Sequence, residues 1–176
     1  RRMTTEAAMT ESAAAPARSR TIAWDDPNIV ARMARDMSGL DLFRKLLAGE
    51  GSPPPIMHLV GQTLEEVDEG RVVMKLEAGE WLYNPIGTVH GGAIATLLDS
   101  VMGCAVHTTL PKGRAYTTLE IKVNYLRGVT VETGSILAEG KAVHVGRRSA
   151  VAEAKAYDSA GKLVATASTT CMVFDL

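Results

Sequence analysis

The residues best suited to chemistry lie in and just before one apolar segment. After the glycine pair Gly91 and Gly92, hydrophobic residues recur at spacings of three and four: Ile94, Leu97, Leu98, Val101, Met102 and Ala105. This spacing predicts a helix that buries one broad face. Between residues 93 and 109 there is no Lys, Arg or Glu, so Asp99 is the single carboxylate of the helix. Burying a carboxylate is unfavourable unless it has a partner or a function.

The two glycines stand where this helix is expected to begin. A helix N-terminus carries unpaired N–H groups and partial positive charge, and a residue without a Cβ lets a ligand oxygen come close. Such a site can stabilise a developing oxyanion. Asp99 lies eight residues beyond Gly91, which at a rise of about 1.5 Å per residue is roughly 12 Å along the axis. If both groups act on one carbonyl, they must come from two chains, as in a symmetric dimer.

These residues belong to a longer pattern. The run Asn84-Pro85-x-Gly87-x-x-His90-Gly91-Gly92 followed by Asp99, with Thr117-Thr118-Leu119-Glu120 and Gly146-Arg147-Arg148 downstream, closely resembles the PaaI-like acyl-CoA thioesterases of the hotdog-fold superfamily. The resemblance covers about Ser38 to the C-terminus. It implies an α+β hotdog fold, in which a curved antiparallel β-sheet wraps a long central helix. It also implies hydrolysis of an acyl-CoA to a free acid and coenzyme A, by a homodimer with shared active sites that assembles further into a tetramer.

The resemblance also assigns roles to individual residues. In the family the acid in the helix is the nucleophile or general base, and this role falls on Asp99. The N–H that polarises the thioester carbonyl falls on Gly91, while Asn84 matches a polar residue that places the carbonyl or the water. His90 matches the motif histidine, and Gly92 is expected to contact the substrate.

One position departs from the family pattern. Related enzymes often carry Thr or Ser one turn after the acid, where this chain has Gly103, and Ser100 is the alternative for positioning the water. We expect the acyl pocket to be lined by the helix and by apolar residues before it, such as Ile86 and Val89.

Each assignment has a structural alternative. Asp99 can be an ordinary buried acid with a hydrogen-bond partner, and the glycines can merely ease the start of the helix. His90 can simply cap or pack that turn. Gly146-Arg147-Arg148 is most simply a turn with two solvated charges, although a guanidinium pair is well suited to the phosphates of coenzyme A.

Two other functions are considered as alternatives to acyl-CoA hydrolysis. A hotdog enoyl-CoA hydratase would carry an Asp and a His about five residues apart at the start of the helix, and here His90 has no such neighbour. A non-enzymatic acyl-CoA-binding sensor would be expected to bring a DNA-binding segment, and the N-terminal residues show no helix-turn-helix pattern.

Composition narrows the class of protein. The chain has 176 residues, of which 46% are hydrophobic and 22% charged, as is ordinary for one soluble globular domain. A net charge of −1 argues against a nucleic-acid partner, and no apolar run approaches the ~20 residues of a membrane helix. Cys104 and Cys171 are expected to be buried thiols, and no metal-ligand spacing or cofactor motif occurs. The expected location is the cytoplasm, and the expected cofactor is none beyond coenzyme A as part of the substrate.

The chain divides into three predicted parts. Residues 1–27 are read as a flexible N-terminal arm, residues 28–55 as short helices with a Pro-rich connector, and residues 56–176 as the hotdog thioesterase domain. The short helices are expected to run to Met37 and from Ser38 to Ala48. Alternation and turn residues predict strands over residues 56–67, 71–77, 119–125, 135–145, 148–158 and 163–174.

Overall fold

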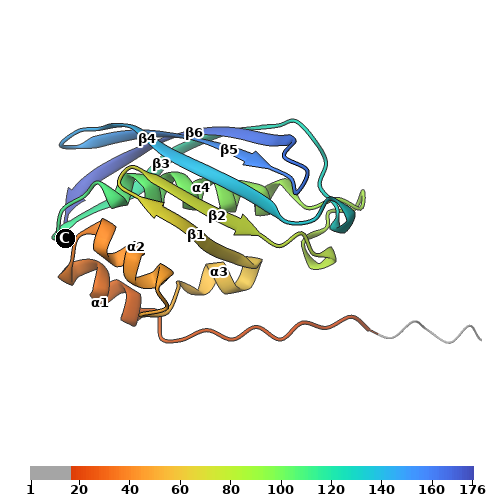
Figure 1. Cartoon of the computed structure of the whole chain (residues 1–176), viewed down its shortest axis with the longest axis horizontal. Coiled ribbons are helices and arrows are strands. Elements are labelled where there is room, and N and C mark those ends of the chain that lie inside the picture. The colour runs from red at the N-terminus through yellow and green to blue at the C-terminus, as the bar shows by residue number, and fades with distance from the viewer. Residues whose placement is uncertain (1–16) are drawn as a thin grey trace, which may run out of the picture.

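A six-stranded antiparallel sheet curves around one long helix in the computed structural model, which describes residues 17–176 (Figure 1). The helix is α4 (Gly91–Thr108). The strands are β1 (Gln62–Asp68), β2 (Arg71–Leu76), β3 (Arg114–Tyr125), β4 (Ile136–Val145), β5 (Ser149–Tyr157) and β6 (Leu163–Asp175), in the spatial order β1-β2-β4-β5-β6-β3. The predicted α+β hotdog architecture is confirmed. Because β3 ends this order, it is an edge strand of the sheet.

The core lies between α4 and the concave face of the sheet. All six apolar residues that predicted the helix are buried. On β5 the alternating alanines Ala150, Ala152, Ala154 and Ala156 are also buried, and their small size lets α4 lie close. The backbone of β4 comes closer still, because a Cβ on Gly140 would lie 2.4 Å from the carbonyl oxygen of Val101. Gly140 therefore has no room for a side chain.

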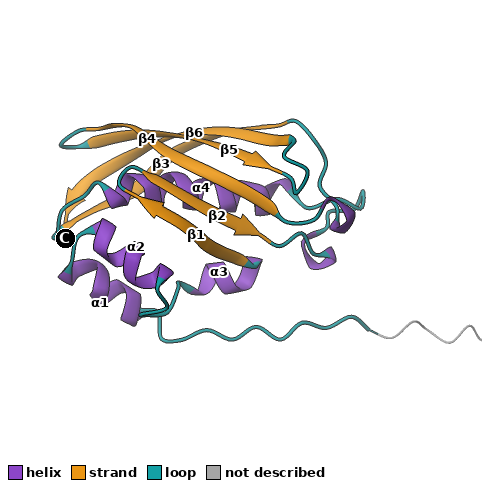
Figure 2. Ribbon diagram, in the orientation of Figure 1, coloured by secondary structure: helices purple, strands orange, loops and turns teal. Residues whose placement is uncertain are grey.

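Three short helices precede the sheet and gather beside β1 (Figure 2). Helices α1 (Asn28–Asp36) and α2 (Gly39–Leu47) confirm the two that were predicted. The Ser38 side chain caps α2 by accepting a hydrogen bond from Asp41 N–H. The start of α2 is docked on the end of α4, since a Cβ on Gly39 would lie 1.8 Å from the carbonyl oxygen of His107.

The prediction of a strand from Ile56 is wrong, because residues 55–60 form the helix α3 (Pro55–Val60). Proline is favoured in the first turn of a helix, and Gly61 ends this one in the left-handed conformation with a φ of 82°. The N–H of Gly61 bonds to the carbonyl oxygen of Met57. The strand therefore begins only at Gln62.

Most of the predicted arm over residues 1–27 lies outside the described residues. Residues 17–26 contain no helix or strand. Arg20 donates to the carbonyl oxygen of Leu59 at 2.9 Å, and its guanidinium lies 4.4 Å from the ring centroid of Trp81. These contacts attach this segment to the end of α3. The three-part division of the chain stays a prediction.

Two further properties follow from the described chain. Among its helices, none combines the length and the hydropathy needed to cross a membrane. Cys104 on α4 and Cys171 on β6 are free thiols; Cys171 is buried as expected, whereas Cys104 is half-buried.

Candidate active site

A tight loop before α4 presents the N-terminus of that helix. Asn84 organises the loop: its Oδ1 accepts from the N–H groups of Ile86 and Thr88, both at 3.1 Å, and its Nδ2 donates to Thr88 Oγ1 at 2.9 Å. Gly87 adopts a positive φ of 78°, which only glycine adopts readily. The Asn84 side chain thus has a clear structural role in this turn.

His90 is the N-cap of α4. Its Nδ1 accepts a hydrogen bond from Gly92 N–H at 2.8 Å, which satisfies one of the open donors of the first turn. No residue among 17–176 accepts a hydrogen bond from Gly91 N–H. The capping alternative for His90 is therefore found in the structure, and it leaves the Gly91 N–H available at the positive end of the helix.

Gly91 opens into a small hollow, which we call the glycine pocket. It has a volume of about 370 Å³, and Asn84, Thr88 and Tyr125 are among the residues that line it. Tyr125, at the end of the edge strand β3, donates its hydroxyl to the Gly91 carbonyl oxygen at 2.8 Å. Val89 also lines this pocket, whereas Ile86 is 83% exposed and does not line it.

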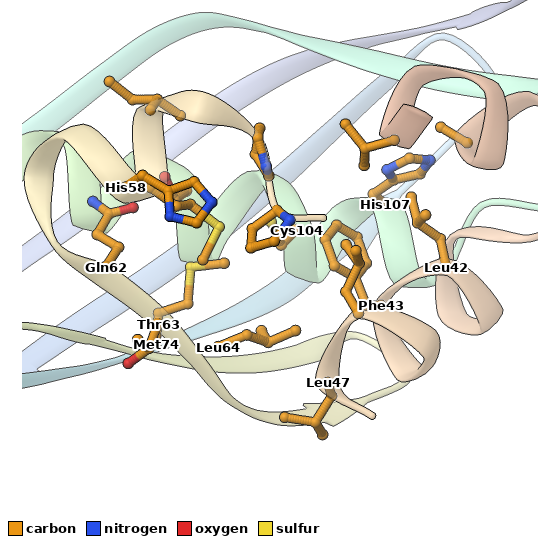
Figure 3. Close-up of a pocket in the computed structure, with 18 of the residues that line it drawn as sticks. Leu42, Phe43, Leu47, His58, Gln62, Thr63, Leu64, Met74, Cys104 and His107 are labelled. Atoms are coloured by element: carbon orange, nitrogen blue, oxygen red, sulfur yellow. The ribbon is translucent and has the colours of Figure 1, made fainter. Parts of the chain in front are cut away.

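Asp99 lines a different and larger space, which we call the acid cavity. Figure 3 shows this cavity with some of its other lining residues. This cavity has a volume of about 610 Å³ and lies between α4 and the N-terminal helices, with Ser100, Cys104 and Tyr116 among its lining residues. The half-buried Asp99 carboxylate accepts a hydrogen bond from Thr118 Oγ1 at 2.9 Å. Thr118 lies on β3, so the same edge strand holds both the acid and the glycine end.

Burial shifts the pKa values of three side chains in this cavity, and two of them, Cys104 and Tyr116, become poor nucleophiles. Burial, together with the nearby Asp99 charge, raises the pKa of the Cys104 thiol to about 12. Burial also raises the pKa of Tyr116 well above its usual value, and burial lowers the pKa of His107. Cys104 and Tyr116 are thus protonated at neutral pH, and His107 is uncharged.

Tyr116 explains why residue 103 is glycine. A Cβ on Gly103 would lie 2.3 Å from the Tyr116 hydroxyl oxygen, so a Thr or Ser at this position would clash with that ring. Ser100, which the sequence offered as the alternative hydroxyl, lines the same cavity as Asp99.

Gly146, Arg147 and Arg148 form the tight turn between β4 and β5, closed by a hydrogen bond of 2.8 Å from Gly146 N–H to the carbonyl oxygen of Ser149. Both arginines are exposed, and neither lines the glycine pocket or the acid cavity. Arg114, at the start of β3, donates to the carbonyl oxygen of Arg147. Within one chain, this turn therefore lies at the end of β3 opposite to Tyr125 and Gly91.

The structure separates the predicted site residues into three groups. Asn84 and Gly91 share the glycine pocket, Asp99 and Ser100 share the acid cavity, and the arginine pair lies apart from both. The sequence did not reveal the hydrogen-bond partners of two site residues, which are Thr118 for Asp99 and Tyr125 for Gly91. Thr118 belongs to the motif run on β3, but strict alternation with Ile121 and Val123 places it on the outward face. The β-bulge between Thr118 and Glu120 turns it towards Asp99, and nothing in the sequence signals that bulge.

Comparisons with known proteins agree with this architecture. The sequence model of the Thioesterase superfamily matches residues 86–165. The chain is 26% identical over 118 residues to the 1,4-dihydroxy-2-naphthoyl-CoA hydrolase of Listeria monocytogenes, covering 67% of this chain and 94% of that protein. A solved phenylacetic acid degradation-related protein of Ralstonia eutropha JMP134 shares 30% identity at a TM-score of 0.67, covering 74% of this chain and 98% of that one.

A third match holds a ligand. The structure of a Streptococcus mutans UA159 protein bound to acetyl-CoA shares 29% identity at a TM-score of 0.59, covering 65% of this chain and 89% of that one. The residues matched by the superfamily model contain α4, β3, β4 and β5, and hence both Gly91 and Asp99. The helices α1 to α3 precede the matched residues.

Proposed function

The chain belongs to the PaaI-like thioesterases of the hotdog-fold superfamily, and from this premise we propose that it hydrolyses acyl-CoA thioesters to a free acid and coenzyme A. The name of the Listeria relative, a CoA thioester hydrolase, supports this substrate class. The acetyl-CoA bound by the Streptococcus relative supports it as well. The observation that carries the proposal is a free N–H at Gly91 combined with a carboxylate at Asp99 on the same helix.

In the proposed reaction, the thioester carbonyl oxygen accepts a hydrogen bond from Gly91 N–H. This contact strengthens as negative charge develops on the oxygen. Asp99 either attacks the carbonyl carbon or removes a proton from the water that attacks it. The C–S bond then breaks, the sulfur leaves with the electron pair, and a proton completes the thiol of coenzyme A. If Asp99 is the nucleophile, water afterwards hydrolyses the acyl-aspartate anhydride.

The two groups are proposed to meet across a dimer that pairs two copies of β3. Within one chain, Asp99 is bonded to Thr118 and Gly91 to Tyr125, at two different points of this edge strand. An antiparallel pair of β3 strands with its two-fold axis near Ile121 would set Thr118 of one copy beside the Tyr125 end of the other. Asp99 of one chain would then approach Gly91 of its partner, and two sites would form. Pairs of such dimers would make the expected tetramer.

The same pairing of two β3 strands suggests a role for the turn of Gly146, Arg147 and Arg148, which we call the arginine turn. Arg114, whose side chain contacts Arg147, starts β3 and would lie beyond Thr118 in the direction of the partner's Gly91 end. We assign Arg147, Arg148 and the turn at Gly146 to binding the phosphates of coenzyme A. Guanidinium groups bind phosphate through paired hydrogen bonds. The cytoplasm is the compartment we propose, since both cysteines are free thiols.

The test is incubation of the purified protein with a panel of acyl-CoAs and a reagent that reports free thiol. We expect stoichiometric thiol release that depends on Asp99. Binding of acyl-CoA without thiol release would favour the sensor instead. Loss of the double bond of an enoyl-CoA without thiol release would favour the hydratase, and either result would overturn the proposal.

A further inference from the structure

Two residues that line the acid cavity have buried side-chain atoms with no hydrogen-bond partner among residues 17–176. Gln62 is only 5% exposed, yet neither its amide nitrogen nor its amide oxygen is bonded. Nε2 of His58 is also buried and unbonded. Both residues line the cavity that Asp99 faces. Since buried polar groups in folded proteins are nearly always paired, this pair points to a ligand that supplies the missing partners.

The two side chains lie at the Asp99 end of the cavity. Figure 3 shows His58 and Gln62 on one side, Phe43 and His107 on the other, and Cys104 between them. Along α4, Asp99 precedes Cys104 and His107 follows it, so Asp99 lies on the side of Cys104 away from His107. A group held by His58 and Gln62 would thus be near the reacting carbonyl.

The other end of the cavity is apolar. Leu42, Phe43, Leu46 and Leu47 of α2 line it, and the Phe43 ring packs edge-on against His107 with the centroids 5.6 Å apart. No Lys or Arg of residues 17–176 lines the cavity, whereas Asp99 contributes a negative charge. A second carboxylate on the acyl group would therefore be repelled and unpaired.

We propose that the preferred substrate carries a hydroxyl group close to the thioester, bound by Gln62 and His58, with an apolar remainder directed towards Leu42 and Phe43. This inference rests on the proposed thioesterase function. A hydroxyl fits because it donates one hydrogen bond and accepts others. The amide oxygen of Gln62 can accept its proton, while the amide nitrogen of Gln62 or the imidazole of His58 donates to its oxygen. His58 and Gln62 precede the residues matched by the superfamily model, so this specificity belongs to the N-terminal segment.

The test compares 3-hydroxyoctanoyl-CoA with octanoyl-CoA, which have the same chain length. We expect the wild type to favour the hydroxylated thioester by about tenfold or more in kcat/KM, because a site built to bond a hydroxyl discriminates against an analogue that lacks it. In Gln62→Leu the ratio should fall to about one, since only the hydroxylated substrate loses a bond. The melting temperature of Gln62→Leu should not fall, because the substitution removes an unpaired buried amide.

Thr63→Val is the matched control. Thr63 lines the same cavity, but its hydroxyl already donates to Glu65 Oε1 at 2.6 Å, so this variant should keep the wild-type ratio. A wild-type ratio near one, with thiol released from both substrates, would overturn the inference and leave the thioesterase function standing. A ratio in Gln62→Leu equal to that of the wild type would do the same. Absence of thiol release from every acyl-CoA would overturn the proposed function and this inference together.

Discussion

The glycine pocket and the acid cavity lie on the same helix but are built in different ways. The turn around Asn84 and the cap from His90 shape the glycine pocket within a few residues of Gly91, and residues 125–129, at and after the end of β3, close its other side. The acid cavity instead brings residues of α1, α2 and α3 against the middle of α4 and the start of β3. The loop and helix start at residues 84–92 can therefore stay unchanged while the acid cavity changes with the helices α1 to α3 that cover it. We expect the chemistry to depend on Gly91 and Asp99 of α4, and the choice of acyl group on the N-terminal helices that cover the acid cavity.

The largest effect is expected from removing the charge of the acid cavity. Asp99→Asn keeps the shape of the side chain but removes the nucleophile or base, so kcat should fall by about two orders of magnitude or more. Thiol release measures the loss. The melting temperature and the affinity for acyl-CoA should stay close to those of the wild type. Near-normal turnover by the folded Asn variant would remove Asp99 from the mechanism.

The glycine pocket can be disabled without breaking the helix. Gly91 is the first residue of α4 and His90 before it is extended, with φ −60° and ψ 134°, so the backbone accepts proline at position 91. The substitution removes the N–H and adds a Cβ near the Tyr125 ring. Gly91→Pro should lower kcat by about 10² to 10³, as the loss of one oxyanion donor does. Gly91→Ala is the control: its Cβ makes the same close contact with the exposed Tyr125 ring, 3.1 Å from Cζ, but the N–H remains.

Mixed dimers test whether the two regions act together across the interface. A verified heterodimer of Gly91→Pro and Asp99→Asn chains contains one intact pair of groups, so it should recover about half of the wild-type activity. Each homodimer should stay inactive. If the heterodimer is as inactive as its parents while all chains are folded, the site does not combine Gly91 of one chain with Asp99 of the other.

The same contrast explains how far the sequence could predict this molecule. Helix α4 and the alanine face of β5 follow from spacing alone, because each packs one regular face against the other. The apolar run from Ile56 suggested a strand, although Pro55 and Gly61 are typical of the start and the end of a short helix such as α3. The hydrogen-bond partner of Asp99 could not be predicted, since Thr118 contacts it from a strand distant in sequence. The same holds for Gln62, which lines the cavity of Asp99 from β1.

The hydrogen bond from Thr118 to Asp99 should have a smaller effect than the carboxylate itself. Thr118→Val removes the donor that orients the carboxylate but keeps the shape of the side chain, and we expect kcat to fall by about tenfold. Thr117→Val is the matched control, because Thr117 is the adjacent exposed residue on the opposite face of β3. Equal losses in the two variants would mean that the strand, rather than the bond to Asp99, is responsible.

The smallest effect concerns the arginine turn, which lies outside both regions and is proposed to hold the far end of the substrate. Replacing Arg147 and Arg148 by alanine should raise KM for full acyl-CoA several-fold and change kcat little, because binding is lost equally from the substrate and the transition state. Both side chains are exposed, so rising salt should weaken substrate binding more in the wild type than in the double variant. An acyl-pantetheine, which lacks the nucleotide, should be hydrolysed equally well by the two proteins. An equal loss on this short thioester would place the effect of the arginines on folding or on the acyl end, and would contradict their role in phosphate binding.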